Sequence, residues 1–163
     1  MTELTDKEKI IKEVYEDKEK GFGSLRETFK EAVKKEEGFR METYYCTEGH
    51  LTGGYGHKML EGEVPPTDKA GWDKLFERDF AKAVAGADDV LKDCPNIDET
   101  ARNIVVEMVY QMGAFGVSKF KGMLKALSEK DYKRASYEML DSLWARQTPN
   151  RAKRMSERMA NIS

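Results

Sequence analysis

Residues 36–57, EEGFRMETYYCTEGHLTGGYGH, divide the chain into two kinds of sequence. Helix-favouring residues stop at Gly38, and β-branched, aromatic and glycine residues follow. The stretch contains two adjacent carboxylates, Glu36 and Glu37, together with one thiol, two histidines and five glycines. A carboxylate at a helix end that faces a small glycine-rich hairpin is suited to acid chemistry. We therefore expect a candidate site where the helix meets the hairpin.

Short strands are expected on both sides of a turn in this stretch. Residues 43–46 and 51–52 are strand-like, and residues 48–49 supply the turn. The three glycines of residues 53–56 weaken any regular strand, but they allow the backbone to approach a ligand closely. Two prolines at residues 65–66 then close the hairpin region.

Helices are expected on both sides of the hairpin region. The residues at 98–113 are apolar nearly all round, which predicts a buried axis for the carboxy-terminal part. The expected helices are 24–37, 68–92 (capped by Thr67 or Asp68), 98–113 (ended by Gly113), 115–127, 131–140 and one that begins at Thr148 with Pro149 in its first position.

These elements predict an α+β fold that is mostly α. Residues 1–23 are expected to form an amino-terminal helical extension, which glycines separate from the rest. Residues 24–67 form a small α/β lobe with the hairpin, residues 68–92 a connecting helix, and residues 93–163 a helical lobe.

Charge is distributed unevenly along the 163 residues. The whole chain carries −2, whereas residues 116–163 hold 11 Lys/Arg and 5 Asp/Glu, a local net charge of +6. A basic half suits an anionic partner such as nucleic acid, a membrane surface or a cell-wall polymer, but ordinary solvated helix faces explain it equally well. Because no apolar run approaches ~18 residues and no apolar signal region begins the chain, we expect a soluble protein without membrane insertion.

The cysteines and histidines allow two further chemistries. Cys46 and Cys94 are expected to be reduced thiols, and together with His50 and His57 they could form a metal-binding site. The C-x3-H-x6-H spacing matches no common structural zinc site, so we expect no metal and no cofactor. A nucleophilic dyad would need Cys46 and a histidine to face each other across the hairpin. The glycine spacing fits no nucleotide-binding motif.

Two other features have a functional and a structural interpretation. Glu37 is a general acid, or it forms a solvated charge pair with Glu36. Gln111 and Gly113 end the buried helix beside Tyr110, where they could line a cleft or simply cap the helix.

The opening stretch resembles the catalytic segment of the T-even phage lysozymes, the phage-type muramidases. Residues 110–120, YQMGAFGVSKF, and residues 144–155, WARQTPNRAKRM, are similar to two further signatures of that family, in its order and at similar distances. The resemblance covers about residues 28–158. It implies a lysozyme-like two-lobed fold, in which a long helix joins a small β-hairpin lobe to a larger helical lobe, with the substrate cleft between them. It also implies inverting hydrolysis of the β-1,4 bond between N-acetylmuramic acid and N-acetylglucosamine in peptidoglycan.

The resemblance also implies residue roles. Glu37 stands where the family has its general acid, and Thr52 where a threonine helps to hold the attacking water. Gly56 and His57 match the pair that closes the hairpin, which makes His57 structural rather than catalytic. Arg151 matches an arginine that reaches across to the catalytic glutamate. The implied substrate-binding positions are Tyr110, Gln111 and Gly113, and also Lys58, Met123 and Glu138, where the family commonly has other residues.

Cys46 is the main departure from the family pattern, because it stands where the resemblance implies a catalytic aspartate. An inverting glycosidase needs one carboxylic acid to protonate the leaving oxygen and a base to activate water. A thiol with its ordinary pKa of about 8.5 is only a few per cent thiolate at neutral pH. Either Cys46 replaces the carboxylate as a partial thiolate, or the protein binds glycan with weak or no turnover.

A second question concerns the pKa of Glu37. A general acid needs a raised pKa, whereas a nearby Arg151 would lower it by stabilising the carboxylate. Burial in the cleft would have to offset that effect.

The expected partner is bacterial peptidoglycan, with no nucleic acid, and the expected state is a monomer. As a phage endolysin, the protein would remain in the host cytoplasm until a holin-dependent release to the periplasm or cell wall. The alternatives are a tail-associated lysozyme and a catalytically weak peptidoglycan-binding or virion structural protein. The amino-terminal extension, with Ile10, Ile11, Val14 and Tyr15 on one face, could dock on a partner, restrain the cleft or pack on the helical lobe.

Overall fold

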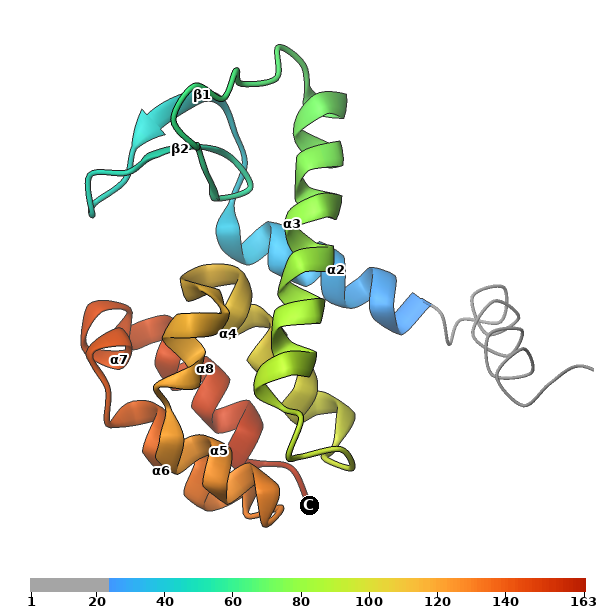
Figure 1. Ribbon diagram of the computed structural model, residues 1–163, viewed down its shortest axis with the longest axis vertical. Coiled ribbons are helices and arrows are strands. Elements are labelled where there is room, and N and C mark those ends of the chain that lie inside the picture. Colours follow the sequence, from blue (N-terminus) through green and yellow to red (C-terminus); the bar gives the residue numbers. More distant parts are fainter. Residues whose placement is uncertain (1–23) are drawn as a thin grey trace, which may run out of the picture. The chain divides into compact units, whose positions relative to one another are not determined.

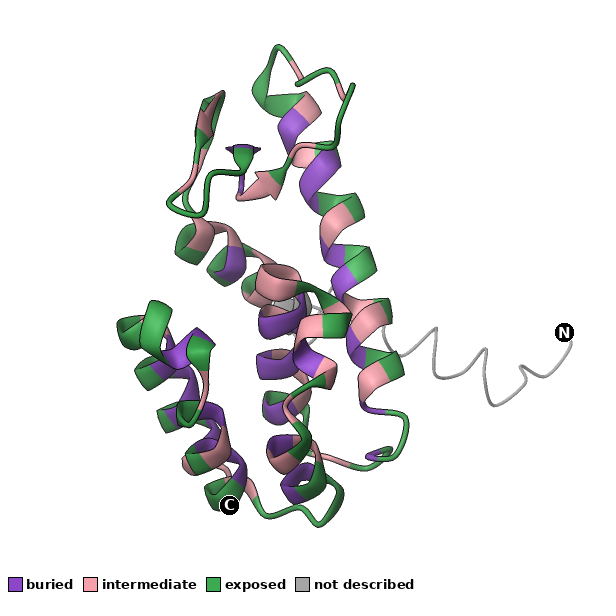
Figure 2. Ribbon diagram, turned by 60° about the vertical axis from the view of Figure 1, so that its left-hand side comes forward, coloured by how far each residue is buried: buried purple, intermediate pink, exposed green. Residues whose placement is uncertain are grey.

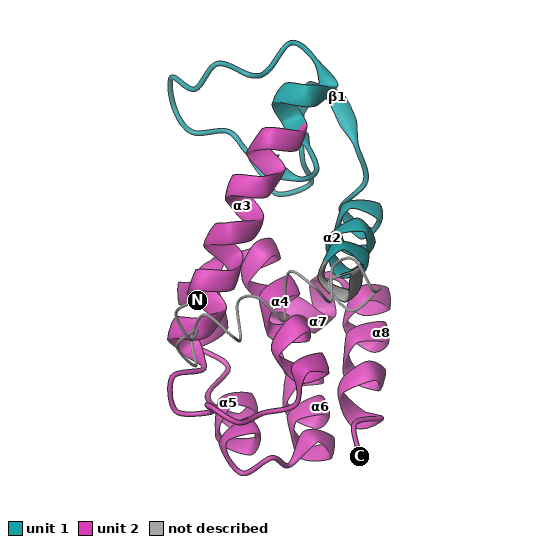
Figure 3. Cartoon of the chain, turned by 90° about the vertical axis from the view of Figure 1, so that its right-hand side faces the viewer, with its two compact units in different colours: residues 1–72 teal, residues 73–163 magenta. Residues whose placement is uncertain are grey.

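The computed structural model describes residues 24–163, and the predicted extension at residues 1–23 lies outside this described part. The chain divides into two compact units, residues 1–72 and residues 73–163 (Figure 3). Helices dominate, and the strands of the described residues form one small antiparallel sheet. The predicted α+β class, mostly α, is confirmed.

The order of the elements along the chain can be followed in Figure 1. The first unit contains α2 (Ser24–Glu37), β1 (Arg40–Tyr45), β2 (Leu51–Gly54), β3 (His57–Lys58) and the start of α3 (Lys69–Val90). The second unit contains the rest of α3, α4 (Glu99–Ser118), α5 (Lys121–Ser128), α6 (Tyr132–Leu140), α7 (Leu143–Gln147) and α8 (Pro149–Ala160).

A glycine determines where α2 ends. Gly38 has a left-handed φ of 74°, and its N–H donates to the carbonyl of Lys34 over 2.9 Å. This single backward bond is a common helix terminator, and it requires a residue that tolerates positive φ. The helix therefore stops at Glu37, and the chain turns directly into β1.

The three strands have the order β1-β2-β3, so β2 is central. Thr52 pairs with Tyr44 on one side and with Lys58 on the other. The turn between β1 and β2 is closed by Gly49, whose N–H donates to the Cys46 carbonyl over 2.9 Å at a φ of 82°. Both predicted strands are present, and β2 extends further than expected, through Gly53 and Gly54.

Trp72 explains why those glycines lie inside a strand. Its indole is only 1% exposed and lies against the backbone of Gly53 and Gly54, where a Cβ at either position would collide with the ring. The indole N–H donates to the Met41 carbonyl over 2.9 Å. The glycines thus make room for an aromatic side chain of the same unit, which packs on the sheet.

The long helices follow the predicted apolar patterns. Asp68 accepts a hydrogen bond from Gly71 N–H at the start of α3, and Asp98 accepts one from Thr100 N–H at the start of α4. Buried and exposed residues alternate along these helices (Figure 2). The fully buried side chains of the second unit include Phe76, Leu91, Ile104, Met108, Met123, Leu127, Met139 and Met159.

Two predictions for the carboxy-terminal helices are confirmed, and one is wrong in detail. Gly113, with a φ of 82°, ends the first helical part of α4 as predicted, and a second part continues after the kink to Ser118. The single helix predicted at 115–127 is instead two segments, broken at residues 119–120. The last helix, α8, starts as predicted, with Thr148 at its cap position and Pro149 in its first turn, although the Thr148 side chain makes no capping hydrogen bond. The Thr148 hydroxyl donates instead to the Trp144 carbonyl of α7, a short helix that the sequence pattern had not indicated.

No helix within residues 24–163 is long and apolar enough to cross a lipid bilayer.

Candidate active site

Glu37 lies at the end of α2, where its half-buried side chain rests against the hairpin. A Cβ built on Gly56 would come within 2.8 Å of the Glu37 Oε2 atom, and Gly56 itself has a left-handed φ of 77°. Gly56 therefore leaves the space that the carboxylate occupies. The neighbouring Glu36 is exposed, so the two adjacent carboxylates have different surroundings.

Aromatic side chains surround this junction within the first unit. The rings of Phe39 and Tyr55 lie 5.0 Å apart, and the Lys34 ammonium lies 5.2 Å from the centre of the Tyr55 ring. Tyr55 is 7% exposed and directly precedes Gly56. Packed side chains therefore fix the segment that faces the carboxylate.

Cys46 and Thr52 form a second cluster, at the end of the β1–β2 hairpin where the turn lies. The Cys46 N–H donates to the His50 carbonyl over 2.9 Å, and the Thr52 hydroxyl donates to the same carbonyl over 2.9 Å. Thr52 is 4% exposed, whereas Cys46 is half-buried. The structure thus brings together two of the three residues expected to be catalytic, with Glu37 in the same unit.

The surroundings of Cys46 favour its thiolate. Partial burial raises the pKa of the thiol, but hydrogen bonds from the backbone at His50 and Glu48 and from the Thr52 side chain outweigh it. The Glu48 charge opposes them, yet the net result is a pKa below the ordinary value. Thr52 has only one hydroxyl proton, which it can donate to the His50 carbonyl or to the sulfur, but not to both. A hydrogen bond from Thr52 to the sulfur therefore excludes its bond to the His50 carbonyl.

His57 and Lys58 stabilise the edge of the sheet. The His57 Nε2 atom lies 3.0 Å from both carboxylate oxygens of Glu63, and Glu63 also accepts the Leu60 N–H over 2.9 Å. The Lys58 ammonium forms an exposed ion pair with Glu48 at 3.6 Å. The sequence had not indicated Glu63, although a histidine followed six residues later by a carboxylate allows such a pairing.

The predicted sugar-binding residues Tyr110, Gln111 and Gly113 lie together on α4 in the second unit. The Tyr110 ring packs 5.7 Å from the Phe76 ring. The Gln111 Oε1 atom accepts a hydrogen bond from the buried Trp144 indole over 2.9 Å. This bond orients the amide so that its NH₂ group points away from the indole. Gly113 is exposed, and nothing lies within 4 Å of the position that a Cβ would occupy.

The remaining three candidate residues of the second unit, Met123, Glu138 and Arg151, have different surroundings. Met123 is fully buried, so a sugar cannot contact its side chain, and this predicted substrate contact is wrong in the present conformation. The Glu138 carboxylate lies against Gly122, and its Oε1 atom is 3.9 Å from the Arg134 Nε atom. Arg151 is half-buried on α8.

Residues 24–163 contain no group of three or more His, Cys, Asp or Glu side chains arranged to hold a metal ion. Cys94, the second cysteine of the metal alternative, is buried in the other unit from Cys46, with its sulfur 3.6 Å from the Leu124 carbonyl. Burial raises the pKa of the Cys94 thiol, Asp93 raises it further, and Arg102 acts against both. Cys94 therefore behaves as a small core residue.

Known proteins are similar in sequence to this chain over most of its length. Residues 34–161 match the Phage lysozyme family. Two Dictyostelium discoideum proteins, probable T4-type lysozymes 2 and 1, are 34% and 30% identical over 154 residues, covering 78% of this chain and 91% of each relative. The pre-baseplate central spike protein Gp5 of Enterobacteria phage T4 is 27% identical over 153 residues, covering 77% of this chain but only 26% of Gp5. Both the family match and the relatives lead to one conclusion: the chain belongs to the phage lysozyme family.

Proposed function

We propose that the protein is a lysozyme that hydrolyses the β-1,4 bond between N-acetylmuramic acid and N-acetylglucosamine, with Glu37 as its general acid. Family membership supports a lysozyme-type glycoside hydrolase that acts on peptidoglycan. The observation that carries the assignment is the position of Glu37, half-buried at a helix end with its carboxylate against Gly56. The Glu37 carboxyl has less access to water than the exposed Glu36, as is expected of a proton donor that faces a bound substrate.

The proposed reaction uses the two clusters of the first unit. Glu37 donates its proton to the glycosidic oxygen as the bond to the anomeric carbon breaks. A water molecule attacks that carbon from the opposite face and gives up a proton to a base. The lowered pKa of Cys46 supports its thiolate as that base, or as a negative charge near an oxocarbenium-like transition state. In this proposal Thr52, whose side chain can bond to the sulfur, holds the attacking water.

The other positions take supporting roles in this proposal. Arg151 keeps the supporting role that the family resemblance implies for it, and Tyr110, Gln111 and Gly113 of the second unit contact the sugar chain through a ring, an amide and an open stretch of backbone. Lys58 and Glu138 are charged residues that could contact peptide or sugar, and His57 maintains the loop after β3 through Glu63.

Two biological settings fit this activity. In the first, the protein is a phage endolysin that a holin releases from the host cytoplasm to the cell wall. In the second, it is a tail-associated lysozyme that opens the wall locally, which the similarity to part of Gp5 favours. A catalytically weak peptidoglycan-binding protein is the candidate outside the enzymes, and the thiol at position 46 is the feature that favours it.

Digestion of purified peptidoglycan tests the proposal. New reducing ends are expected, because hydrolysis of a glycosidic bond frees an anomeric carbon. New free amino groups would instead identify an amidase or peptidase. The absence of both products, with retained binding to the polymer, would support the binding protein.

A further inference from the structure

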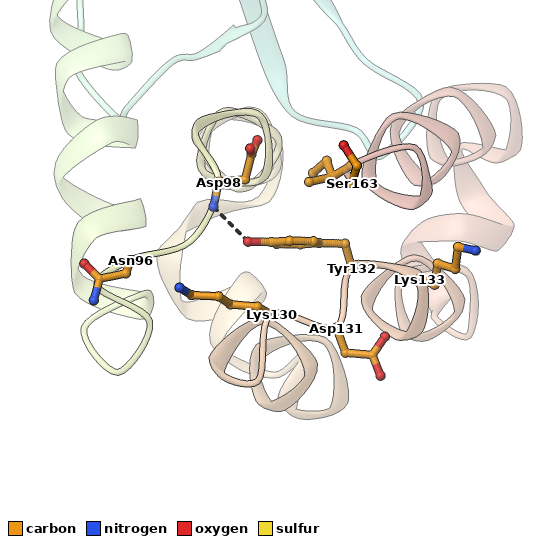
Figure 4. A pocket seen from close by; sticks show the side chains of 8 residues that line it. Asn96, Asp98, Lys130, Asp131, Tyr132, Lys133 and Ser163 are labelled. Carbon is orange, nitrogen blue, oxygen red and sulfur yellow. Dashed lines mark hydrogen bonds between the residues drawn. The ribbon is translucent and has the colours of Figure 1, made fainter.

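The second unit contains a pocket that no proposed catalytic or substrate-binding residue lines. Its volume is ≈ 520 Å³. It lies at the junction between α5 and α6, beside the segment that leads into α4 (Figure 4). Seven of its lining residues carry polar side chains that can donate or accept hydrogen bonds: Asn96, Asp98, Lys130, Asp131, Tyr132, Lys133 and Ser163. Its volume falls within the ~300–1,000 Å³ range of sites that hold small ligands.

The local backbone builds this pocket at the end of α5. The Asp131 N–H reaches back to the Ala126 carbonyl over 2.8 Å, and Lys130 adopts a left-handed φ of 57° to allow it. The chain then turns immediately into α6, with Asp131 as the cap that accepts Arg134 N–H over 3.1 Å. Lys130, Asp131 and Tyr132 therefore follow one another around the pocket.

Tyr132 supplies a fixed aromatic surface. Its half-buried side chain lies in the middle of the lining residues, with Lys130 extended beside it (Figure 4). The hydroxyl oxygen accepts the Asp98 N–H over 2.9 Å, which holds the ring in place. The apolar C–H face of a pyranose packs well on such a ring, whose polar tip is already bonded.

The lining residues retain both donors and acceptors for a ligand. Asp98 and Asp131 each use Oδ1 to cap a helix, and their second oxygens have no hydrogen bond within residues 24–163. Over the same residues, the side chains of Asn96, Lys130 and Lys133 take part in no hydrogen bond or ion pair. Sugar hydroxyl and acetamido groups donate and accept at once, so they match this mixed set.

The charges of the lining side chains favour a neutral ligand over a polyanion. The two lysines and two aspartates of the lining sum to zero formal charge. A site for phosphate or a polyanionic chain would carry an excess of cationic groups. An uncharged, hydroxyl-rich molecule with one apolar face fits the ring, the donors and the acceptors together.

We propose that this pocket is a second carbohydrate-binding site, which holds one or two N-acetylated sugar units of a glycan strand separately from the bond being cleaved. The identity of the ligand rests on the proposed function, because that function makes a glycan the substrate. Such a site would raise the effective concentration of the enzyme on insoluble wall material.

The test is a titration of the isotopically labelled full chain with β-1,4-linked N-acetylglucosamine oligomers, followed by amide NMR shifts. The Glu37→Gln variant serves as background, so that hydrolysis does not consume the probe. We expect saturable shifts at residues 96–98 and 130–133. Tyr132→Ala should weaken this binding about 10-fold, since it removes the ring and one hydrogen bond. Tyr137→Ala is the matched control, because Tyr137 is 74% exposed on the same helix outside the pocket, and it should leave the binding unchanged.

Three results would overturn the proposal: no shifts at the pocket, equal losses in Tyr132→Ala and Tyr137→Ala, or stronger shifts with inorganic phosphate than with the sugar. If Tyr132→Ala does not fold, the exposed Asn96→Ala and Lys130→Ala variants replace it, with an expected loss of about 3-fold each. The NMR readout needs no turnover. It is therefore independent of the reducing-end assay, in which wild-type protein without product would refute the proposed function instead.

Discussion

Gly56 and Glu37 form the contact on which the catalytic assignment depends. Gly56 combines a left-handed backbone with the absence of a Cβ, and the Glu37 carboxylate fills the space so created. Gly62 has nearly the same φ, 78° against 77°, but nothing lies within 4 Å of its Cβ position. The two glycines therefore share a backbone requirement and differ in what lies beside them.

This difference gives a prediction for two alanine variants. Gly56→Ala and Gly62→Ala should each lose ~1–2 kcal/mol of unfolding free energy, because both force alanine into the left-handed region. Only Gly56→Ala should also displace Glu37 and lower kcat, by about 100-fold if proton donation is lost. Urea unfolding and peptidoglycan hydrolysis measure the two effects. Equal activity losses in both variants would show that the contact with the carboxylate is irrelevant.

Cys46 gives a prediction about pH. If its thiolate acts as base, the rate should rise as pH increases through the lowered thiol pKa, because only the deprotonated form accepts a proton. Cys46→Asp should move that rise to acidic pH, since an ordinary aspartate has a pKa of about 3.9. Cys46→Ser and Cys46→Ala should lose about 100-fold in rate.

The pH–rate profiles of wild type and these three variants decide between the two hypotheses for Cys46. An inactive wild type beside a lytic Cys46→Asp would exclude the active thiolate and favour the binding protein. If Cys46→Ala hydrolyses peptidoglycan as fast as wild type, Cys46 takes no part in catalysis.

The link between α4 and α7 joins a predicted sugar contact to the core. Gln111 accepts the indole N–H of Trp144, whose ring is 8% exposed and packs edge-on against Phe120 at 6.1 Å. Gln111→Ala would leave that N–H without an acceptor in a largely buried position, so the free energy of unfolding should fall by ~1–3 kcal/mol. Gln111→Glu keeps an oxygen acceptor and should restore most of the stability.

The same pair of variants separates a structural role from a substrate role for Gln111. If the amide NH₂ donates to sugar, Gln111→Glu should fold normally and still show a raised KM. Thermal unfolding and steady-state kinetics of the two variants provide the readouts. Normal KM in Gln111→Glu would confine the residue to positioning Trp144.

The sequence predicted the elements whose ends carry a chemical signal. Asp68 and Asp98 mark helix starts with side-chain caps, and Gly38 marks a helix end with positive φ. Local patterns could not predict elements that depend on distant partners. The strand through Gly53 and Gly54 requires the indole of Trp72 beside it, and α7 is organised by the hydroxyl of Thr148 and by Gln111.

The candidate site shows the same limit. Glu37, Thr52 and Cys46 could be selected from their types and from the family resemblance. The burial of Met123 could not, because it depends on packing between segments that are separate in the sequence. The pairing of His57 with Glu63 is local, but the spacing of the two residues allows it without requiring it. Glu63, which orients His57, belongs to none of the motifs that the sequence shows.

The molecule as a whole is nearly neutral, but its carboxy-terminal part is basic. Residues 116–163 carry a net charge of +6 within a chain of net charge −2. If these cationic residues attract the peptide carboxylates of the wall, binding to insoluble peptidoglycan should weaken several-fold between 0.05 and 0.5 M salt, because added ions screen exposed charges. Sedimentation with wall material measures this, and peptidoglycan with amidated carboxylates should show little salt dependence.

The most direct test of the central claim compares two adjacent carboxylates. Glu36 is exposed, whereas Glu37 is half-buried against Gly56, so Glu36→Gln and Glu37→Gln make the same chemical change in two different surroundings. With reducing-end release from purified peptidoglycan as the measurement, we predict that Glu37→Gln loses at least about 100-fold in rate, while Glu36→Gln retains wild-type activity. Wild-type rates in Glu37→Gln, or equal losses in both variants, would contradict the assignment of Glu37 as the general acid.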